Sequence, residues 1–292
     1  ADESMAEFIL SAFSDEAGID LDEQIRACQA NGITHMELRG LPQGNVSSLT
    51  TDDAWVLKAK LDAEGMQVSA IGSPYGKMNI ADDFEPHFAA FQNTVEVAKI
   101  LGCHLIRMFS FYFDEGQSYE AYRDEVFSRV GRMADYALAH NVLCCHENEK
   151  GIYGDTAERC LDLYQHFEGR LAGVFDPANF IQCGVHPLEA YEMLEPYILY
   201  MHVKDAKMAD GSVTPAGAGD GQVGEILRRF QKMDGKRFLS LEPHLKVFAG
   251  LSALEKDDET AQKMEQYAYP TNRAAFDAAA QAMHRLLSGL NA

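Results

Sequence analysis

Short apolar segments alternate with longer segments of helical periodicity along the chain, and this alternation is the strongest constraint on its fold. Each apolar segment is nearly continuous in Val, Ile, Leu or Phe, as expected for strands of a parallel sheet covered on both faces. The predicted strands begin at Phe8, His35, Gln67, His104, Asn141, Leu171, Tyr197 and Arg237. Their repeat of roughly 30 to 40 residues predicts one domain, a single (β/α)8 TIM barrel over residues 1–292. A doubly wound sheet is the alternative, but FSDEAG after the first strand is not a glycine-rich phosphate turn.

Composition and charge argue against several classes of function. The net charge is −20 and the pI is near 4.8, without a basic stripe, so we expect no nucleic-acid partner. No apolar stretch reaches the roughly 20 residues of a membrane span, and the N-terminus does not resemble a signal peptide. We therefore expect a cytoplasmic protein with no membrane contact. The six cysteines form no CxxC pair, which is typical of a reducing compartment. We also expect Met5 to be the native start and residues 1–4 to be an added remnant.

The last four predicted strands end in residues that can bind a metal ion. They end in CCHENE, VFDPAN, MHVKD and LSLEPH, which place Glu147, Asp176, His202 and Glu242 at the rim where barrel active sites lie. Alone, each has an ordinary explanation as a solvated acid, a cap or a core histidine. Together they put three carboxylates at one rim, which is costly unless a cation neutralises them. This mostly oxygen donor set suits Mn²⁺, Mg²⁺ or Co²⁺ better than a structural zinc.

Polar residues near these four are candidates for binding substrate. Lys204 lies two positions after His202, on the same strand face, where its ammonium could hold a substrate oxygen or a developing enolate. Asn179 and His244 follow two of the metal-ligand candidates and could bind substrate hydroxyls.

Three neighbouring segments receive other interpretations. We expect Asp15 and Glu16 to cap the next helix rather than contact substrate, and residues 217–225, GAGDGQVGE, to form a flexible loop beside the rim. Residues 245–269 are poorly periodic and are predicted to form a long loop over the active site.

The segments HENEKGIYGDT, FDPANF, HVKD and LSLEPH, each after its strand, resemble the xylose isomerase-like TIM-barrel superfamily of sugar phosphate isomerases and epimerases. The resemblance implies one divalent metal ion bound by Glu147, Asp176, His202 and Glu242, usually Mn²⁺, with Mg²⁺, Co²⁺ and Zn²⁺ as alternatives. It also implies that Glu147 and Glu242 act as acid and base on opposite sides of a small sugar or oxo-sugar. Self-association into a homo-oligomer is compatible with it.

This chain departs from the ketose 3-epimerases of that superfamily at three places. Asn179 replaces a histidine, KDAKM replaces a segment with an arginine after the histidine ligand, and Tyr153 replaces a glutamate. These departures argue against epimerisation of a free ketohexose and leave inososes and 3-oxo-glycosides as substrates to consider.

The sequence therefore predicts a sugar isomerase or epimerase that removes a proton next to a carbonyl and forms an enediolate. A lyase that cleaves 3-oxo-glycosides by β-elimination is the first alternative, because it begins with the same proton removal. An endonuclease IV-like nuclease and a non-catalytic sugar-binding subunit are alternatives of other classes. The nuclease is disfavoured by the charge and by the absence of the extra histidines of that branch.

Overall fold

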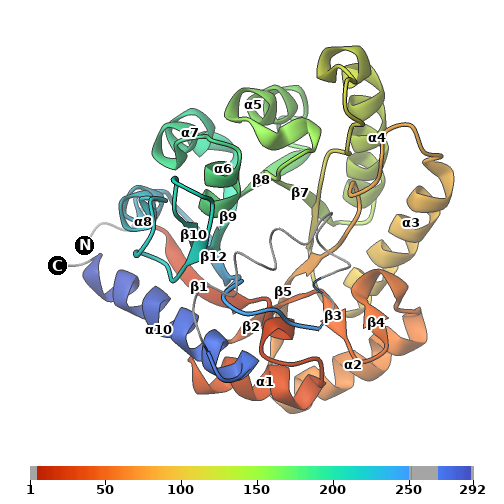
Figure 1. Ribbon diagram of the computed structural model, residues 1–292. Coiled ribbons are helices and arrows are strands. Elements are labelled where there is room, and N and C mark those ends of the chain that lie inside the picture. The colour runs from red at the N-terminus through yellow and green to blue at the C-terminus, as the bar shows by residue number, and fades with distance from the viewer. Residues whose placement is uncertain (1–4, 250, 252–268, 291–292) are drawn as a thin grey trace.

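A closed barrel of parallel strands forms the centre of the computed structural model, which describes residues 5–249, 251 and 269–290 (Figure 1). The strands are hydrogen-bonded in the order β1–β12–β9–β8–β7–β6–β5–β2, and β2 pairs with β1 to close the barrel. Their bounds are Glu7–Ala12 (β1), His35–Leu38 (β2), Gln67–Gly72 (β5), Leu105–Met108 (β6), Leu143–Glu147 (β7), Leu171–Phe175 (β8), Ile198–Val203 (β9) and Lys236–Leu241 (β12). The predicted (β/α)8 barrel is confirmed.

Helices form the outer ring around the strands (Figure 1). Local signals set several of their ends: Thr50 and Asp53 form a capping box at the start of α2, and Ser118 caps α4 through the Ala121 N–H. The helices are Leu21–Ala30 (α1), Thr51–Ala63 (α2), Glu85–Ile100 (α3), Tyr119–Ala139 (α4), Ala157–His166 (α5), Pro177–Gln182 (α6), Pro187–Leu194 (α7), Val223–Gln231 (α8) and Asn272–Gly289 (α10).

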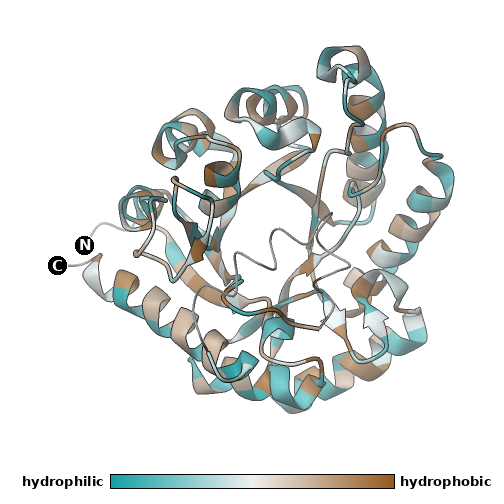
Figure 2. Ribbon diagram, in the orientation of Figure 1, coloured by the Kyte–Doolittle hydropathy of each residue, from teal (hydrophilic) through white to brown (hydrophobic). Residues whose placement is uncertain are grey.

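The apolar core has two main parts because successive strand residues point to opposite faces. The larger part lies between the strands and the helices, and teal and brown alternate along these helices in Figure 2, as expected when one face of each is buried. The smaller part fills the barrel interior and consists of Ala70, Cys145, Val174 and Tyr200. Above it, toward the carboxyl ends of the strands, the inward-pointing residues become charged.

Two predicted features lie wholly or mostly outside the described residues. Most of the loop predicted over residues 245–269 lies outside the described residues, as do residues 1–4. Leu245 and Phe248, at the start of that segment, are buried. None of the helices in the described part of the chain has the length and apolar character needed to cross a bilayer.

Candidate active site

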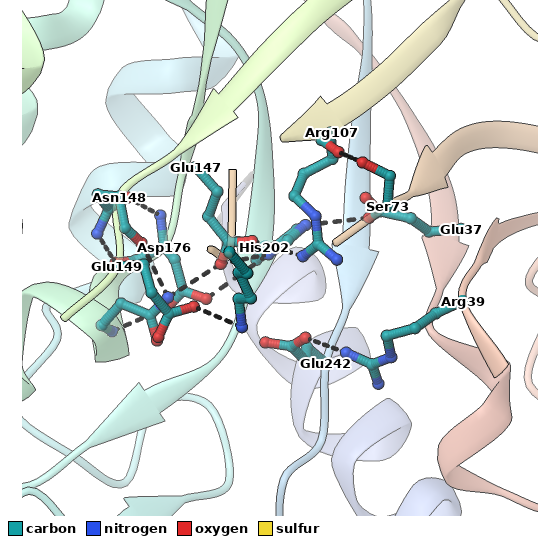
Figure 3. Close-up of polar contacts among 12 residues, drawn as sticks. Glu37, Arg39, Ser73, Arg107, Glu147, Asn148, Glu149, Asp176, His202 and Glu242 are labelled. Carbon is teal, nitrogen blue, oxygen red and sulfur yellow. Dashed lines mark hydrogen bonds and ion pairs between the residues drawn. The ribbon is translucent and has the colours of Figure 1, made fainter. Parts of the chain in front are cut away.

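The four predicted metal ligands meet at the carboxyl ends of adjacent strands (Figure 3). Glu147 ends β7, Asp176 follows β8, His202 lies near the end of β9 and Glu242 follows β12. Their ligand-type atoms lie within 4.8 Å of one another, and all four side chains are buried. Parallel pairing in register brings them together, since β9 aligns His202 with Ser240 of β12, two residues before Glu242.

The donor set fits a divalent cation. His202 Nδ1 lies 3.1 Å from Glu147 Oε2 and 3.6 Å from Asp176 Oδ2. Both His202 Nδ1 and Asp176 Oδ2 are buried without a hydrogen-bond partner among the described residues. Lone pairs of nitrogen and carboxylate oxygen directed at one small volume repel each other unless a positive charge lies between them. Three carboxylates and one imidazole would therefore hold an ion that prefers oxygen ligands.

Each of the two glutamates is paired with an arginine that the sequence interpretation missed. Arg107 of β6 donates from Nη1 to Glu147 Oε1 at 2.7 Å, and Arg39, one residue after β2, donates from Nη1 to Glu242 Oε2 at 2.7 Å. Both guanidinium groups are nearly fully buried, and Phe13 packs against both of them. The available signal was an arginine inside or at the end of an otherwise apolar strand, where burial requires a carboxylate partner.

The predicted substrate residues Lys204 and Asn179 lie within the same cluster. Lys204 Nζ donates to Glu242 Oε1 at 2.7 Å and to Asn179 Oδ1 at 2.9 Å, and lies 3.1 Å from Asp176 Oδ2. The Asn179 amide nitrogen donates to Glu147 Oε2 at 2.9 Å. Asn179 and Lys204 thus form a hydrogen-bonded connection between the two glutamates.

The expectation that Asp15 and Glu16 cap the next helix is wrong. The helix α1 begins at Leu21, after Asp20, and both acids instead lie buried at the rim. Asp15 accepts two hydrogen bonds from Arg39, at 2.8 and 3.0 Å. Glu16 accepts from the backbone N–H of the third predicted substrate residue, His244, and pairs with its Nδ1 at 2.7 Å. The physical reason is that buried cations need these carboxylates more than a solvent-exposed helix end does.

Burial and the neighbouring charges shift the pKa values of the three carboxyl groups in different directions. Against the effect of burial, His202 lowers the pKa of Glu147, and Lys204 lowers the pKa of Glu242 well below its usual range. Burial raises the pKa of Asp176 despite the nearby Lys204 ammonium. Both glutamates are therefore ionised near neutral pH.

A small pocket opens onto this cluster, and its walls are charged. It is lined by Arg39, Lys77, Arg107, Glu147, Glu149, Lys204, Glu242 and His244. The pocket therefore offers hydrogen-bond donors and acceptors, suited to a polar molecule with several oxygen atoms.

Comparison with known proteins places the chain in a family. The sequence model described as the xylose isomerase-like TIM barrel matches residues 25–267. The chain belongs to the xylose isomerase-like TIM-barrel family. Among curated proteins, none matches the sequence significantly.

Solved structures share this fold at low sequence identity. D-Psicose 3-epimerase from Clostridium cellulolyticum H10, solved with D-tagatose, is 14% identical with a TM-score of 0.69, over 97% of this chain and 99% of that one. The probable 3-DHS dehydratase from Bacillus anthracis is 18% identical with a TM-score of 0.68, over 89% of this chain and 97% of that one. A xylose isomerase-like TIM barrel protein from Mycobacterium smegmatis, in complex with magnesium, is 16% identical with a TM-score of 0.66, over 97% of each chain. These similarities establish the shared barrel fold.

One loop beside the candidate active site is held in place by hydrogen bonds, whereas a flexible loop was predicted. Residues 217–221 wrap around the buried carboxylate of Asp205, which accepts hydrogen bonds from the N–H groups of Gly217, Gly219 and Gly221 at 2.8 to 3.1 Å. A Cβ on Gly219 would lie 2.5 Å from the Ala206 carbonyl oxygen, so this approach requires glycine. The glycines therefore fix the loop to the residue that follows Lys204, which corrects the prediction of a flexible loop.

Proposed function

We propose that this chain is a divalent-metal-dependent enzyme that isomerises or epimerises a small sugar or oxo-sugar by moving a proton next to its carbonyl group. The observation that carries the proposal is the placement of Glu147 and Glu242 with Asp176 and His202, with ligand-type atoms within 4.8 Å of one another. A divalent ion bound by these four residues would polarise the carbonyl and stabilise the negative charge that develops when the proton leaves. Mn²⁺ is the preferred ion, with Mg²⁺, Co²⁺ and Zn²⁺ as alternatives, and the magnesium of the Mycobacterium smegmatis structure supports a divalent ion.

Glu242 and Glu147 are the proposed base and acid. They come from strands separated by β8 and β9, so their carboxylates approach a substrate from different sides. One glutamate removes the proton from the carbon beside the carbonyl, and the electron pair moves to the carbonyl oxygen to give an enediolate. Proton return to the same carbon from the opposite face gives an epimer, whereas return to the adjacent carbon gives an aldose–ketose isomer.

Lys204 and His244 are the proposed substrate contacts because both line the pocket. The Lys204 ammonium, 2.7 Å from Glu242, is placed to donate a hydrogen bond to the oxygen that becomes negative. Asn179 was also predicted to bind substrate, and its contacts favour an additional task, which is to hold Glu147 and Lys204 in position.

A lyase acting by β-elimination is the second candidate. The same carbanion can expel an oxygen leaving group at the next carbon if a nearby acid protonates that oxygen. Lys204 and His244 supply two such donors beside Glu242, and Glu16 and Glu242 raise the pKa of His244 to about 10 against the effect of burial. The similarity to a probable dehydratase is consistent with this chemistry.

Deuterium exchange tests the proposal. The Mn²⁺-loaded protein is incubated in D2O with D-fructose, D-psicose, an inosose and a 3-oxo-glucoside, and each is followed by NMR and mass spectrometry. We expect deuterium at the carbon beside the carbonyl of one of them, with an epimer, isomer or elimination product that identifies the reaction. Chelation of the metal should abolish the exchange. A product formed without deuterium would point to a hydride shift, and tight sugar binding without any exchange would support a non-catalytic subunit.

A further inference from the structure

A buried carboxylate from a non-adjacent strand contacts His202, the histidine of the proposed metal site. Glu37 belongs to β2, which neighbours β1 and β5, whereas His202 belongs to β9, which neighbours β12 and β8. Their side chains nevertheless meet inside the barrel, where Glu37 Oε1 lies 3.0 Å from His202 Nε2. Tyr200, two residues before His202 on the same strand face, donates from its hydroxyl to Glu37 Oε2 at 2.8 Å. All three side chains are at most 1% exposed (Figure 3 shows Glu37 and His202).

This contact decides which nitrogen of His202 carries a proton. A neutral imidazole has one N–H, and an ionised carboxylate facing Nε2 accepts only if that N–H is on Nε2. The lone pair is then on Nδ1, which is the nitrogen that faces Glu147 and Asp176. The Phe13 ring packs edge-on against His202, with 4.9 Å between ring centroids, and limits rotation of the imidazole.

We infer that Glu37, held by Tyr200, is a positioning residue that fixes the tautomer and orientation of His202 for a divalent ion. The inference rests on the proposed metal site and adds two residues that lie outside the set of candidate ligands. A carboxylate hydrogen-bonded to the far nitrogen of a metal-binding histidine fixes its ring and increases its basicity toward the metal.

The substitution Glu37→Gln should reverse the hydrogen-bond pattern. The Tyr200 hydroxyl keeps its acceptor only if the new amide oxygen faces it, and the amide NH2 group then faces His202 Nε2. An NH2 group needs an acceptor, so the imidazole proton moves to Nδ1 and blocks the lone pair that would bind the metal. We expect Mn²⁺ affinity to fall about 10- to 100-fold.

The double variant Glu37→Gln, Tyr200→Phe distinguishes an effect of the His202 tautomer on metal affinity from an effect of side-chain packing. Without the tyrosine hydroxyl, the amide can turn its oxygen toward His202 Nε2, and Nδ1 regains its lone pair. The double variant should therefore bind Mn²⁺ several-fold more tightly than Glu37→Gln alone, although it carries more substitutions. A loss caused by packing alone would become larger in the double variant. Tyr191→Phe is a matched control, because its buried ring lies outside the barrel with its hydroxyl 3.9 Å from Met233 Sδ.

Mn²⁺ affinity is measured by titration calorimetry and by the electron paramagnetic resonance signal of free Mn²⁺, and thermal unfolding of the metal-free variants verifies that each is folded. Wild-type protein that binds no divalent ion would contradict the proposed function itself. If the wild type binds Mn²⁺ and Glu37→Gln binds it within twofold as well, the proposed function stands and this inference is wrong. Equal weakening in the single and double variants would also overturn it, whereas recovery in the double variant supports it.

Discussion

Asn179 and Lys204 are hydrogen-bonded to each other, with 2.9 Å between Oδ1 and Nζ. At its other end Asn179 donates to Glu147, and Lys204 donates to Glu242, so one continuous set of hydrogen bonds joins the two proposed acid–base residues. Asn179 lies where the ketose 3-epimerases that this sequence resembles carry a histidine. Lys204 lies in the segment where they carry an arginine. An amide and an ammonium group thus orient the proposed acid and base. We therefore expect the substrate to differ from that of those epimerases.

We predict that Glu242→Gln slows solvent deuterium exchange by roughly 10²-fold or more, because an amide cannot accept the proton. Glu147→Gln should slow it to a similar extent if both glutamates take part. Exchange is measured at saturating Mn²⁺ so that weakened metal binding does not account for the loss. Glu225→Gln is the matched control, because this half-buried glutamate of α8 pairs with Arg228 and Arg229 rather than with the site, and the change should leave the rate unchanged. Exchange at the wild-type rate in both single site variants would eliminate the two-carboxylate mechanism.

We predict that the purified protein holds about one equivalent of a divalent metal ion, because four ligand-type residues converge on one volume. Elemental analysis after dialysis measures the metal content per chain. The double variant Glu147→Gln, Asp176→Asn removes two of the three carboxylates and should lose most of the metal. Asp155→Asn, placed in the short helix before α5, serves as the control. Full metal content in the double variant would show that the ion binds elsewhere.

The order of strands and the four ligand candidates could be predicted because they depend on local patterns. Each strand is an apolar run, and each ligand candidate follows such a run directly, so the barrel topology alone brings Glu147, Asp176, His202 and Glu242 to one rim. The family match to residues 25–267 confirms this interpretation of the fold.

The partners of those ligands could not be predicted, because they depend on contacts across the barrel. Glu37 and His202 are 165 positions apart, and Arg39 and Glu242 are 203 apart, so no local pattern connects them. Asp15 resembled a helix cap in the sequence because short acidic residues before a helix usually are caps. Its actual role depends on a buried arginine, Arg39, which directly follows the next strand.

We predict that Gly219→Ala destabilises the protein, by about 2 kcal/mol, because the new methyl group would overlap the Ala206 carbonyl oxygen and the Asp205 carboxylate. Gly224→Ala is the matched control at the start of α8, where a Cβ would lie 3.6 Å from Leu286, an ordinary contact. Alanine should stabilise that helical position by roughly 0.5 to 1 kcal/mol. Chemical denaturation measures the free energy of unfolding of both variants. Equal stability of the two would contradict the packing of this loop around Asp205.

His87 should make the protein less stable in mild acid. Its Nε2 accepts a hydrogen bond from the Gly76 N–H at 2.9 Å, and burial, together with the nearby Arg129, lowers its pKa from 6.5 to about 4. Between these two values the unfolded chain binds a proton that the folded chain does not, so stability falls as the pH drops from 6.5 toward 4. After allowance for partial solvent screening, wild type should lose about 1 to 2 kcal/mol more than His87→Gln between pH 7 and pH 4.5. Glutamine preserves an acceptor for Gly76 and does not titrate. His186→Gln, at an exposed position, is the control for a histidine-to-glutamine change. The same loss in His87→Gln as in wild type would show that folding does not lower the pKa of His87.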